Sequence, residues 1–279
     1  DRIDFANDSV IASVRGPLGS TSRNRFAAAG NSNYGWFGGG LGISAVDRIN
    51  FSNDTAIASV RGSLSSPREN PGATSGQAKS SSIRLQKAAN FGWFGGGLVP
   101  ATPAPLIRST VDRIDFSNDS VTASPRGPLS LARWGSAATG NSNFGWFGGG
   151  LNPSGTISTV ERIDFSNDSA TASPRGPLSL ARTQLAATGN SNYGWFGGGS
   201  APSVPGTVTR VDRIDFSNDL ATASPRGPLS LSRSELVATG NSNYGWFGGG
   251  AVLFPSPLDT VDRINFSNDL ATALARGPL

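Results

Sequence analysis

The feature that most constrains this chain is a seven-residue string that occurs five times. It reads Tyr or Phe followed by GWFGGG, and the copies stand at 34–40, 91–97, 144–150, 193–199 and 244–250. A catalytic residue is needed once, whereas a string that returns nearly unchanged solves one packing problem repeatedly. The chain is therefore expected to be built from similar units.

A second string gives the length of the unit. A DRIDF-type sequence occurs six times, and the isoleucines that anchor it are Ile3, Ile49, Ile114, Ile163, Ile214 and Ile264. Their spacing is roughly fifty residues, apart from insertions at 65–87 and 98–110. Strand-like segments with a period of about 50 residues are typical of β-propeller blades.

Four short strands fit each unit. They are SAAT (136–139), FGWF (144–147), a TVDRIDF strand (110–116) and a VTASPRGPL strand (121–129), separated by polar turns such as 140–143. The 37 Gly and 18 Pro residues leave little room for long helices. We predict an all-β fold, a propeller of four-stranded antiparallel blades.

The aromatic string has a packing explanation. Alternation along a strand places Phe144 and Trp146 on one face and Phe147, beside Gly145, on the other. Neighbouring blades cover both faces of such a strand, so large rings meet small residues across the boundary. Burial of one ring is worth about 2–3 kcal/mol. The residues predicted to pack between blades are Trp146, Phe147, Trp195 and Trp246.

The arginine of the DRI string is a charge that every unit repeats. By alternation Arg113 shares a strand face with Asp115, and that face is expected to pack on the next blade. A buried guanidinium needs a partner, and the repeated aspartates supply one. We predict an Arg–Asp network between blades that includes Arg113, Asp115, Arg162 and Arg213. A ring of anion-binding sites is the alternative.

The DFSND string has the spacing of metal ligands. Asp115, Ser117 and Asp119 place oxygens at positions 1, 3 and 5, as calcium loops do. The glycine at position 6 and the distal bidentate glutamate are missing, and the first copy has Ala6 instead of serine. A turn in which Asn and Asp bond their own backbone explains the string better. We predict no metal site.

The unit resembles the kelch repeat. It combines a strand that ends in a glycine pair (Gly148, Gly149), a strand of alternating residues (111–116), a polar turn and a fourth strand with proline. Ile114 and Val121 stand where the kelch signature has Tyr and Trp. The strings VDRIDFSND, ASPRGPLSLAR and GNSNYGWFGGG also resemble repeats in structural proteins of tailed marine phages. The first resemblance implies a propeller, and the second implies a tail or virion role.

The ends of the chain bear on the number of blades. Residues 1–18 carry a third and a fourth strand, and five complete units follow at 19–64, 65–129, 130–178, 179–229 and 230–279. A ring closes well when both termini share its last blade. We predict one domain (1–279) of six blades, with the inner strands of one blade in chain beyond this sequence. Five blades with an extra hairpin is the alternative, followed by a fragment of a larger ring.

The composition argues against catalysis. The chain has no Cys, His or Met, which removes thiolate and imidazole chemistry. Copper-oxidase propellers need His and a Cys-linked Tyr, and sialidases need a Tyr nucleophile with an acid, whereas Tyr34, Tyr193 and Tyr244 all stand in the packing string. We predict no catalytic residue, no cofactor and no enzyme activity.

The charge does not indicate nucleic-acid binding. The net charge is +4, but residues 112–133 balance three arginines with three aspartates, and the surplus basic residues are scattered. No apolar run approaches the ~20 residues of a membrane-spanning helix. We predict neither a nucleic-acid partner nor a membrane span.

The segments that differ between units are the candidates for binding. Those after the glycine run are rich in Pro and apolar residues and poor in charge. Stiff apolar loops suit a lasting protein contact, because they lose little entropy on docking. The alternative is that these loops fold over their own blades. The candidate contact residues are Leu98, Val99, Leu106, Ile107, Val252, Leu253 and Phe254.

Two functions fit these features. The first is a non-enzymatic structural protein, a phage tail or other virion component that docks other proteins of an assembly through the variable loops. The alternative is a secreted or surface lectin-like propeller that binds glycans in pockets repeated once per blade. A repeated-site lectin keeps its exposed ligand residues alike, whereas here the exposed loops differ. We therefore expect an assembly protein, at a virion or in the extracellular space.

Overall fold

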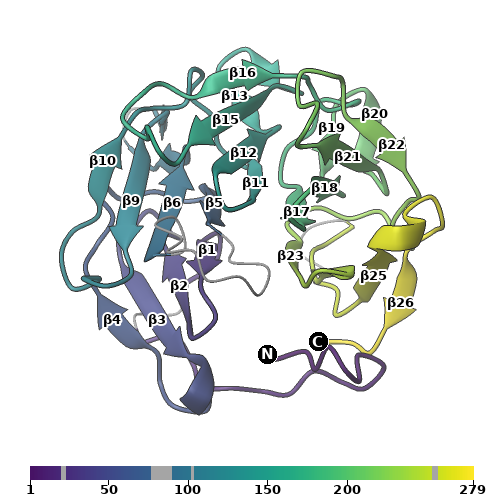
Figure 1. Ribbon diagram of the computed structural model, residues 1–279, viewed down its shortest axis with the longest axis horizontal. Helices are drawn as coiled ribbons and strands as arrows, with labels where there is room; N and C mark the ends of the chain where they lie inside the picture. The colour runs from purple at the N-terminus through teal and green to yellow at the C-terminus, as the bar shows by residue number, and fades with distance from the viewer. Residues whose placement is uncertain (20–22, 77–89, 102–103, 253–256) are drawn as a thin grey trace.

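The computed structural model describes residues 1–19, 23–76, 90–101, 104–252 and 257–279. Its strands form five four-stranded antiparallel sheets that stand around a ring as blades (Figure 1). Three two-stranded hairpins are added to the ring among the described residues. The protein is an all-β propeller.

Each blade runs from an inner first strand to an outer fourth strand (Figure 1). The strands are β1 (Ala27–Gly30), β2 (Tyr34–Gly38), β3 (Val46–Asn50) and β4 (Ser59–Arg61) in blade 1; β5 (Gly72–Ser75), β6 (Phe91–Gly95), β9 (Val111–Asp115) and β10 (Ser124–Arg126) in blade 2; β11 (Ala137–Gly140), β12 (Phe144–Gly148), β15 (Val160–Asp164) and β16 (Ser173–Arg175) in blade 3; β17 (Ala186–Gly189), β18 (Tyr193–Gly197), β21 (Val211–Asp215) and β22 (Ser224–Arg226) in blade 4; and β23 (Val237–Gly240), β24 (Tyr244–Gly248), β25 (Val261–Asn265) and β26 (Leu274–Arg276) in blade 5. The 3₁₀ turns η1 (Phe51–Asn53) and η3 (Phe266–Asn268) follow β3 and β25.

The second strand of each blade carries the aromatic string into the core. In blade 3, Trp146 and Phe147 are fully buried, and β12 pairs Trp146 with Arg162 of β15. The ring of Phe144 meets that of Trp146 edge to face at 5.8 Å, so the two lie on one side of the sheet. Phe147 points to the other side, toward blade 2.

A phenylalanine of one blade fills a space left by a glycine of the blade before it. A β-carbon on Gly95 would lie 2.7 Å from the ring of Phe147, and one on Gly197 would lie 2.7 Å from the ring of Phe247. The same contact joins Gly38 with Phe94 and Gly148 with Phe196. Only glycine fits such close approach, because a methyl group would overlap the ring. This repeated contact explains why the string alternates aromatic residues with glycine.

The structure holds five complete blades, the number that the sequence analysis gave as its alternative to six. Residues 1–18 form no sixth sheet: Arg2 and Ser13 make one isolated bridge, and no described second strand pairs beside them. A third strand without a second cannot extend its ladder. Residues 1–18 nonetheless stand between blades 5 and 1 (Figure 1).

Backbone hydrogen bonds hold this segment on both sides. Gly277 N donates to Asp8 O at 2.9 Å, and Gly16 N donates to Asp54 O at 2.8 Å. Blades 3 and 4 are joined in the same way, by Gly176 N and Asp219 O at 2.8 Å. The outer wall of the propeller is therefore continuous through six positions.

The fourth strands are shorter than the sequence indicates. The strand predicted at 121–129 spans Ser124–Arg126, because the residues before it complete the turn that begins at Asp115. Pro125 faces Asp112 in this outer strand, and the next pair is Arg126 with Val111. Proline thus lies at the sheet edge, where no further strand needs its missing N–H group.

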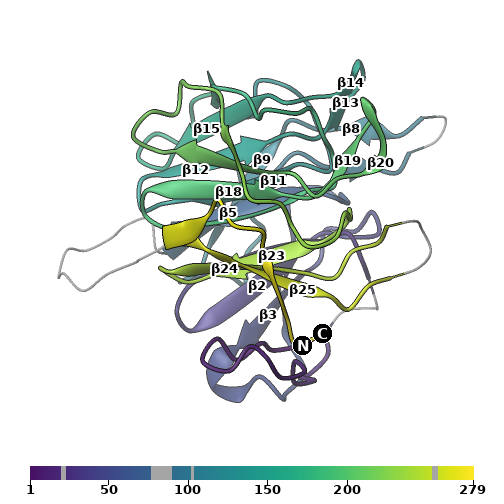
Figure 2. The same ribbon diagram turned by 90° about the vertical axis from the view of Figure 1, so that its right-hand side faces the viewer.

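The variable loops gather at one end of the blades, where each second strand turns into the third. Here lie the hairpins β7 (Leu98–Val99) with β8 (Leu106–Ile107), β13 (Leu151–Asn152) with β14 (Gly155–Thr156), and β19 (Ser200–Ala201) with β20 (Val204–Thr207). Figure 2 shows β8, β13, β14, β19 and β20 together on one side. We call this side the loop face and the opposite side, which carries the GNSN and SND turns, the turn face. Within the described part of the chain, no helix is long and apolar enough to cross a membrane.

Candidate interaction surfaces

The loop face exposes several of the apolar residues predicted for partner contact. Leu98 pairs with Ile107 and Val99 with Leu106 across the β7–β8 hairpin, where Leu106 is 47% exposed and the other three are half-buried. In blade 5, Val252 is 38% exposed. Leu253 and Phe254 lie outside the described residues. The candidate contact residues thus come from two blades that are not neighbours.

The same loops are also anchored to the scaffold. Isolated bridges join Glu69 with Leu98, Trp134 with Leu151, Thr183 with Ser200 and Ser234 with Ala251. Glycines with positive φ, such as Gly149 (+68°) and Gly150 (+106°), allow the chain to turn into each loop, and Gly150 N donates to Arg182 O at 2.9 Å. The loops therefore rest partly on their own blades, as the alternative interpretation expected, while their tips stay exposed.

A second set of exposed apolar residues lies on the turn face. The residues after each SND turn are largely exposed and include Ile11, Ile57, Val121, Leu220 and Leu270. The sequence pattern predicts a strand at Val121, and this exposed set was therefore not expected. The signal was present, because an apolar residue directly after a turn cluster has no partner strand to cover it.

The predicted Arg–Asp network exists at every described boundary between blades, with one difference in its aspartates. Arg113 Nη1 lies 3.0 Å from Asp168 Oδ2, Arg162 Nη1 lies 2.9 Å from Asp219 Oδ2, and Arg213 Nη1 lies 3.1 Å from Asp269 Oδ2. Each partner belongs to the SND turn of the next blade. Asp115 instead stays in its own turn, where its Oδ1 accepts from Ser117 N at 2.9 Å and Ser117 Oγ at 2.6 Å.

The tryptophans join the same carboxylates. Trp146 Nε1 donates to Asp219 Oδ2 at 2.9 Å, and Trp195 Nε1 donates to Asp269 Oδ2 at 2.9 Å. Trp146 also stacks on Phe216 of the next blade at 3.8 Å, and Trp246 stacks on Phe5 at 4.1 Å. These contacts give the aromatic string a second role, because it locks each blade to the one that follows it.

In the five complete blades, the DRI arginines are enclosed rather than free to bind anions. Arg162 lies over the ring of Phe144 at 4.2 Å, and Arg213 lies over Tyr193 at 4.3 Å. With a carboxylate on one side and a ring on the other, each guanidinium is already occupied. This arrangement favours the structural interpretation over a ring of anion sites.

A set of fully buried ion pairs was not predicted. Arg68 Nη2 lies 2.7 Å from Asp112 Oδ2, and Arg182 Nη2 lies 3.1 Å from Asp212 Oδ2. Burial lowers the pKa of Arg182 to about 10, although the charge of Asp212 acts in the opposite direction. The sequence contains a signal for these pairs. An arginine stands in or near each SLAR-type segment, and an acidic residue stands directly before each DRI arginine. The other such pairs are Arg23 with Asp47, Arg133 with Glu161 and Arg233 with Asp262.

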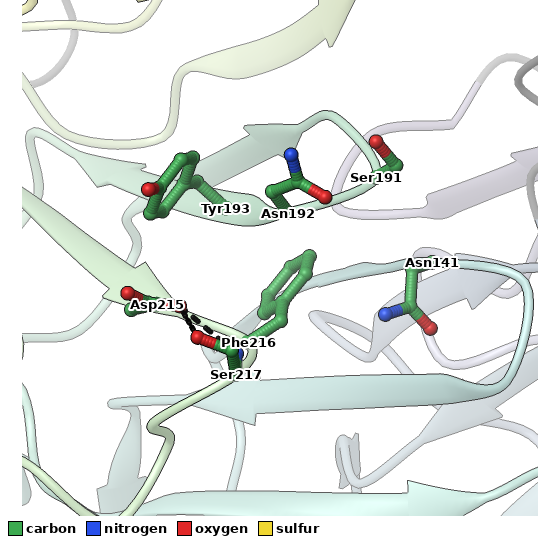
Figure 3. A pocket seen from close by; sticks show the side chains of 7 residues that line it. All are labelled: Asn141, Ser191, Asn192, Tyr193, Asp215, Phe216 and Ser217. Carbon is green, nitrogen blue, oxygen red and sulfur yellow. Dashed lines mark hydrogen bonds between the residues drawn. The ribbon is translucent and has the colours of Figure 1, made fainter.

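A polar hollow of about 410 Å³ opens on the turn face between blades 3 and 4. Figure 3 shows that Tyr193, Asp215 and Phe216 come from one blade and Asn141 from the other. Its oxygens are largely engaged in their own turns: Asp215 Oδ1 accepts from Ser217 N and Oγ, and Asn141 Oδ1 accepts from Asn143 N. The lining residues are Asn141, Ser191, Asn192, Tyr193, Asp215, Phe216 and Ser217.

The calcium-like spacing of the DFSND string does not assemble a ligand cluster. Asp115 bonds to Ser117, whereas Asp119 Oδ2 accepts from Trp36 Nε1 at 2.7 Å in the preceding blade. The two carboxylates therefore serve different partners. No group of three or more His, Cys, Asp or Glu residues suited to a metal ion occurs among the described residues.

Comparison with known proteins supports the fold. No protein-family model and no curated protein matches the sequence. The solved structure of YjhT, a β-propeller of kelch-like fold, superposes with a TM-score of 0.70 at 13% identity, covering 91% of this chain and 84% of that one. These values support a kelch-type propeller. Nothing in the comparisons supports the resemblance to phage structural proteins.

Proposed function

We propose that this propeller is a non-enzymatic interaction protein that forms part of a larger assembly and docks its neighbours through the loop face. The observation that carries the proposal is that the repeated residues and the variable residues lie in different parts of the molecule. Repeated residues lock blade to blade in the interior, while the loops that differ between blades carry exposed Leu106 and Val252 at one end. A scaffold of uniform blades with varied, anchored loops suits a permanent contact.

The assembly that we propose is a virion, with a phage tail as the specific case, and the location is therefore virion-bound or extracellular. The test is to fractionate the native source on a density gradient and follow this chain by peptide mass spectrometry. Banding with nuclease-protected DNA supports the proposal. Sedimentation as a free chain of 28.7 kDa argues against any stable assembly.

Variants separate the loop face from the rest of the surface. Leu106→Ser and Val252→Ser together should reduce incorporation into the assembly, because both residues are exposed on the loop face. Val121→Ser is the matched control, since it removes a similar exposed apolar group from the turn face. Equal incorporation of both variants would refute the loop face as the docking surface.

Glycan binding is the second candidate, and the hollow in Figure 3 is the observation that favours it. Its Asn and Ser residues recur in the GNSN strings of blades 1, 3 and 5, and its tyrosine recurs in blades 1 and 5, as expected of a lectin with repeated sites. A glycan array with the purified protein tests this function. Binding that is lost in Tyr193→Ala but kept in Leu106→Ser would favour the lectin over the assembly protein.

A further inference from the structure

The propeller has six outer positions but five sets of inner strands. Residues 1–18 occupy the outer half of the sixth position, and none of the described residues forms first and second strands there. Blades 5 and 1, on its two sides, keep the surfaces with which other blades contact each other. Each unfilled contact can therefore be compared with a filled one elsewhere in the ring.

On blade 5, the inner strand β23 is uncovered. Val237 is 64% exposed, whereas Ala137 and Ala186 at the same place in blades 3 and 4 are each 6% exposed. Thr239 is also exposed, while its counterpart Thr188 is buried against Gly245 of the next blade. The face of β23 thus lacks the neighbour that β11 and β17 have.

Blade 5 also has a glycine space without its phenylalanine. A β-carbon on Gly197 would lie 2.7 Å from the ring of Phe247. At Gly248 the nearest atoms would be those of Leu279 and Val261, each at 3.6 Å, which is ordinary contact. No aromatic ring fills this space among the described residues, and the side chain of Leu279 lies beside it.

On blade 1, the residues that receive a tryptophan have none among the described residues. Phe116 of blade 2 stacks on Trp36 at 3.7 Å and is 8% exposed, whereas Phe51 at the same place in blade 1 is 48% exposed. Asp119 accepts from Trp36, whereas Asp54 pairs with Arg2 and Arg15. An indole is the group that these two residues lack.

Two further residues fit the same explanation. Arg2 has a side chain that is 55% exposed, whereas Arg162 is covered by the ring of Phe144. Phe37 of blade 1 is half-buried, in contrast to the fully buried Phe94 and Phe147 that enter glycine spaces. Both residues face contacts that a second strand of the repeat would supply.

From these exposed, complementary surfaces we infer that the inner half of the sixth position binds a β-hairpin of the repeat's own kind, supplied by a partner chain. The hairpin consists of a small-residue strand, a GNSN turn and a strand reading aromatic-Gly-Trp-Phe-Gly. Its phenylalanine enters the space at Gly248, its tryptophan stacks on Phe51 and donates to Asp54, and its aromatic residue lies under Arg2. Addition of strands to an incomplete sheet is a known mode of peptide recognition. A second copy of this chain is poorly suited, because the tryptophans of its own five GWF strings are all buried.

A synthetic peptide with the sequence of residues 182–199 tests the inference. We expect calorimetric titration into the intact protein to show one peptide bound per chain, together with a higher melting temperature. The control peptide carries Trp195→Ala and should bind about tenfold more weakly or worse, since it loses both the stacking and the indole hydrogen bond. Absence of binding, or equal binding of the two peptides, overturns the proposal.

A variant of the protein tests whether the hairpin binds in the sixth position. Gly248→Ala should leave the melting temperature of the free protein unchanged, because the added methyl group meets ordinary contacts. It should weaken peptide binding about tenfold, because the methyl group occupies the space for the phenylalanine. Val121→Ala, on the turn face, is the matched control and should bind as the wild type does. Peptide binding that Gly248→Ala leaves intact, or a stable dimer of the chain that blocks the peptide, would show that the site has another occupant.

Discussion

At the residue scale, a single carboxylate links each pair of complete blades. Asp219 Oδ2 accepts from Trp146 Nε1 and Arg162 Nη1, both at 2.9 Å, and Arg175 Nε lies 3.4 Å from it. Removing the charge leaves two arginines without their counter-ion and weakens the acceptor for a buried indole. The free energy of unfolding should therefore be sensitive to the replacement of one carboxylate oxygen of Asp219 by an amide nitrogen.

We predict that Asp219→Asn lowers the free energy of unfolding by about 2–4 kcal/mol. Asp54→Asn is the matched control in blade 1, where no described indole donates and the side chain of Arg2 is 55% exposed. Its loss should be below about 1 kcal/mol, as for other exposed ion pairs. Urea unfolding of both variants measures the difference, and equal losses would show that the tryptophan contact contributes little.

A second residue-scale prediction concerns acid stability. The hydroxyl of Ser217 holds the pKa of Asp215 below its usual value of 3.8, with help from the backbone N–H of Ser217 and the charge of Arg213. A carboxyl whose pKa is lower in the folded state stabilises it fully above pH 3.8, and that stabilisation is lost as the pH falls through the lower, folded pKa. The effect is modest, because the side chain of Asp215 is partly exposed to solvent.

Asp215→Asn should therefore lose less stability between pH 7 and pH 3 than the wild type. The chain already contains the substitute, since Asn50 and Asn265 stand at this place in blades 1 and 5 and accept from Ser52 and Ser267 in the same way. The variant should thus keep its turn. Unfolding titrations at both pH values measure the loss, and parallel losses would exclude a contribution from Asp215.

At the scale of the element, the outer strands differ in how they are protected at the edge. Blade 2 has Pro125 opposite Asp112, whereas blade 1 has Val60 opposite Asp47, and Val60 is 59% exposed. An exposed β-branched residue on an edge strand invites pairing with another chain, and proline prevents it. The strand β4 is thus less protected against pairing with another chain than its counterpart β10.

We predict that Val60→Pro stabilises the protein by about 0.4–1 kcal/mol, because proline restricts the unfolded chain and the fold already accepts it at this place in blades 2, 3 and 4. The variant should also aggregate more slowly on heating. Thermal unfolding with light scattering measures both effects. Destabilisation would mean that the backbone N–H of Val60 donates a hydrogen bond that has no equivalent at Pro125, since proline has no N–H group.

The strands could be predicted from the sequence because each has a local signal. Alternation assigned Trp146 and Phe147 to opposite faces, and turn residues bounded the strands to within a few positions. Contacts between blades have no such signal. Asp115 and Asp119 look equivalent in DFSND, and the choice of Asp168 as the partner of Arg113 depends on how the next blade is placed. The exposure of Val121 likewise depends on where the fourth strand begins, which is Ser124, three residues later than predicted.

At the scale of the whole molecule, the propeller behaves as a chain of similar units whose stability comes from nearest-neighbour contacts. Blades 2, 3 and 4 have a complete neighbour on both sides, whereas the inner strands of blades 1 and 5 each have a neighbour on one side among the described residues. The hydrogen-bonded outer wall still holds blades 1 and 5 through residues 1–18, as the contacts of Gly277 and Gly16 show. The lower stability expected of blades 1 and 5 is therefore confined to their inner strands.

Amide hydrogen exchange should make this asymmetry visible. We predict that β1 and β23 exchange about tenfold faster than β11 and β17, which corresponds to about 1.4 kcal/mol of lost protection. The comparison is well matched, because Val237 and Ala186 occupy equivalent positions in strands of equal length and differ in exposure, at 64% and 6%. If the sixth position accepts a hairpin, the peptide of residues 182–199 should slow exchange in β1 and β23 together and leave β11 unchanged. Equal protection of all inner strands without the peptide would mean that contacts between blades contribute little, and that each sheet is stable by itself.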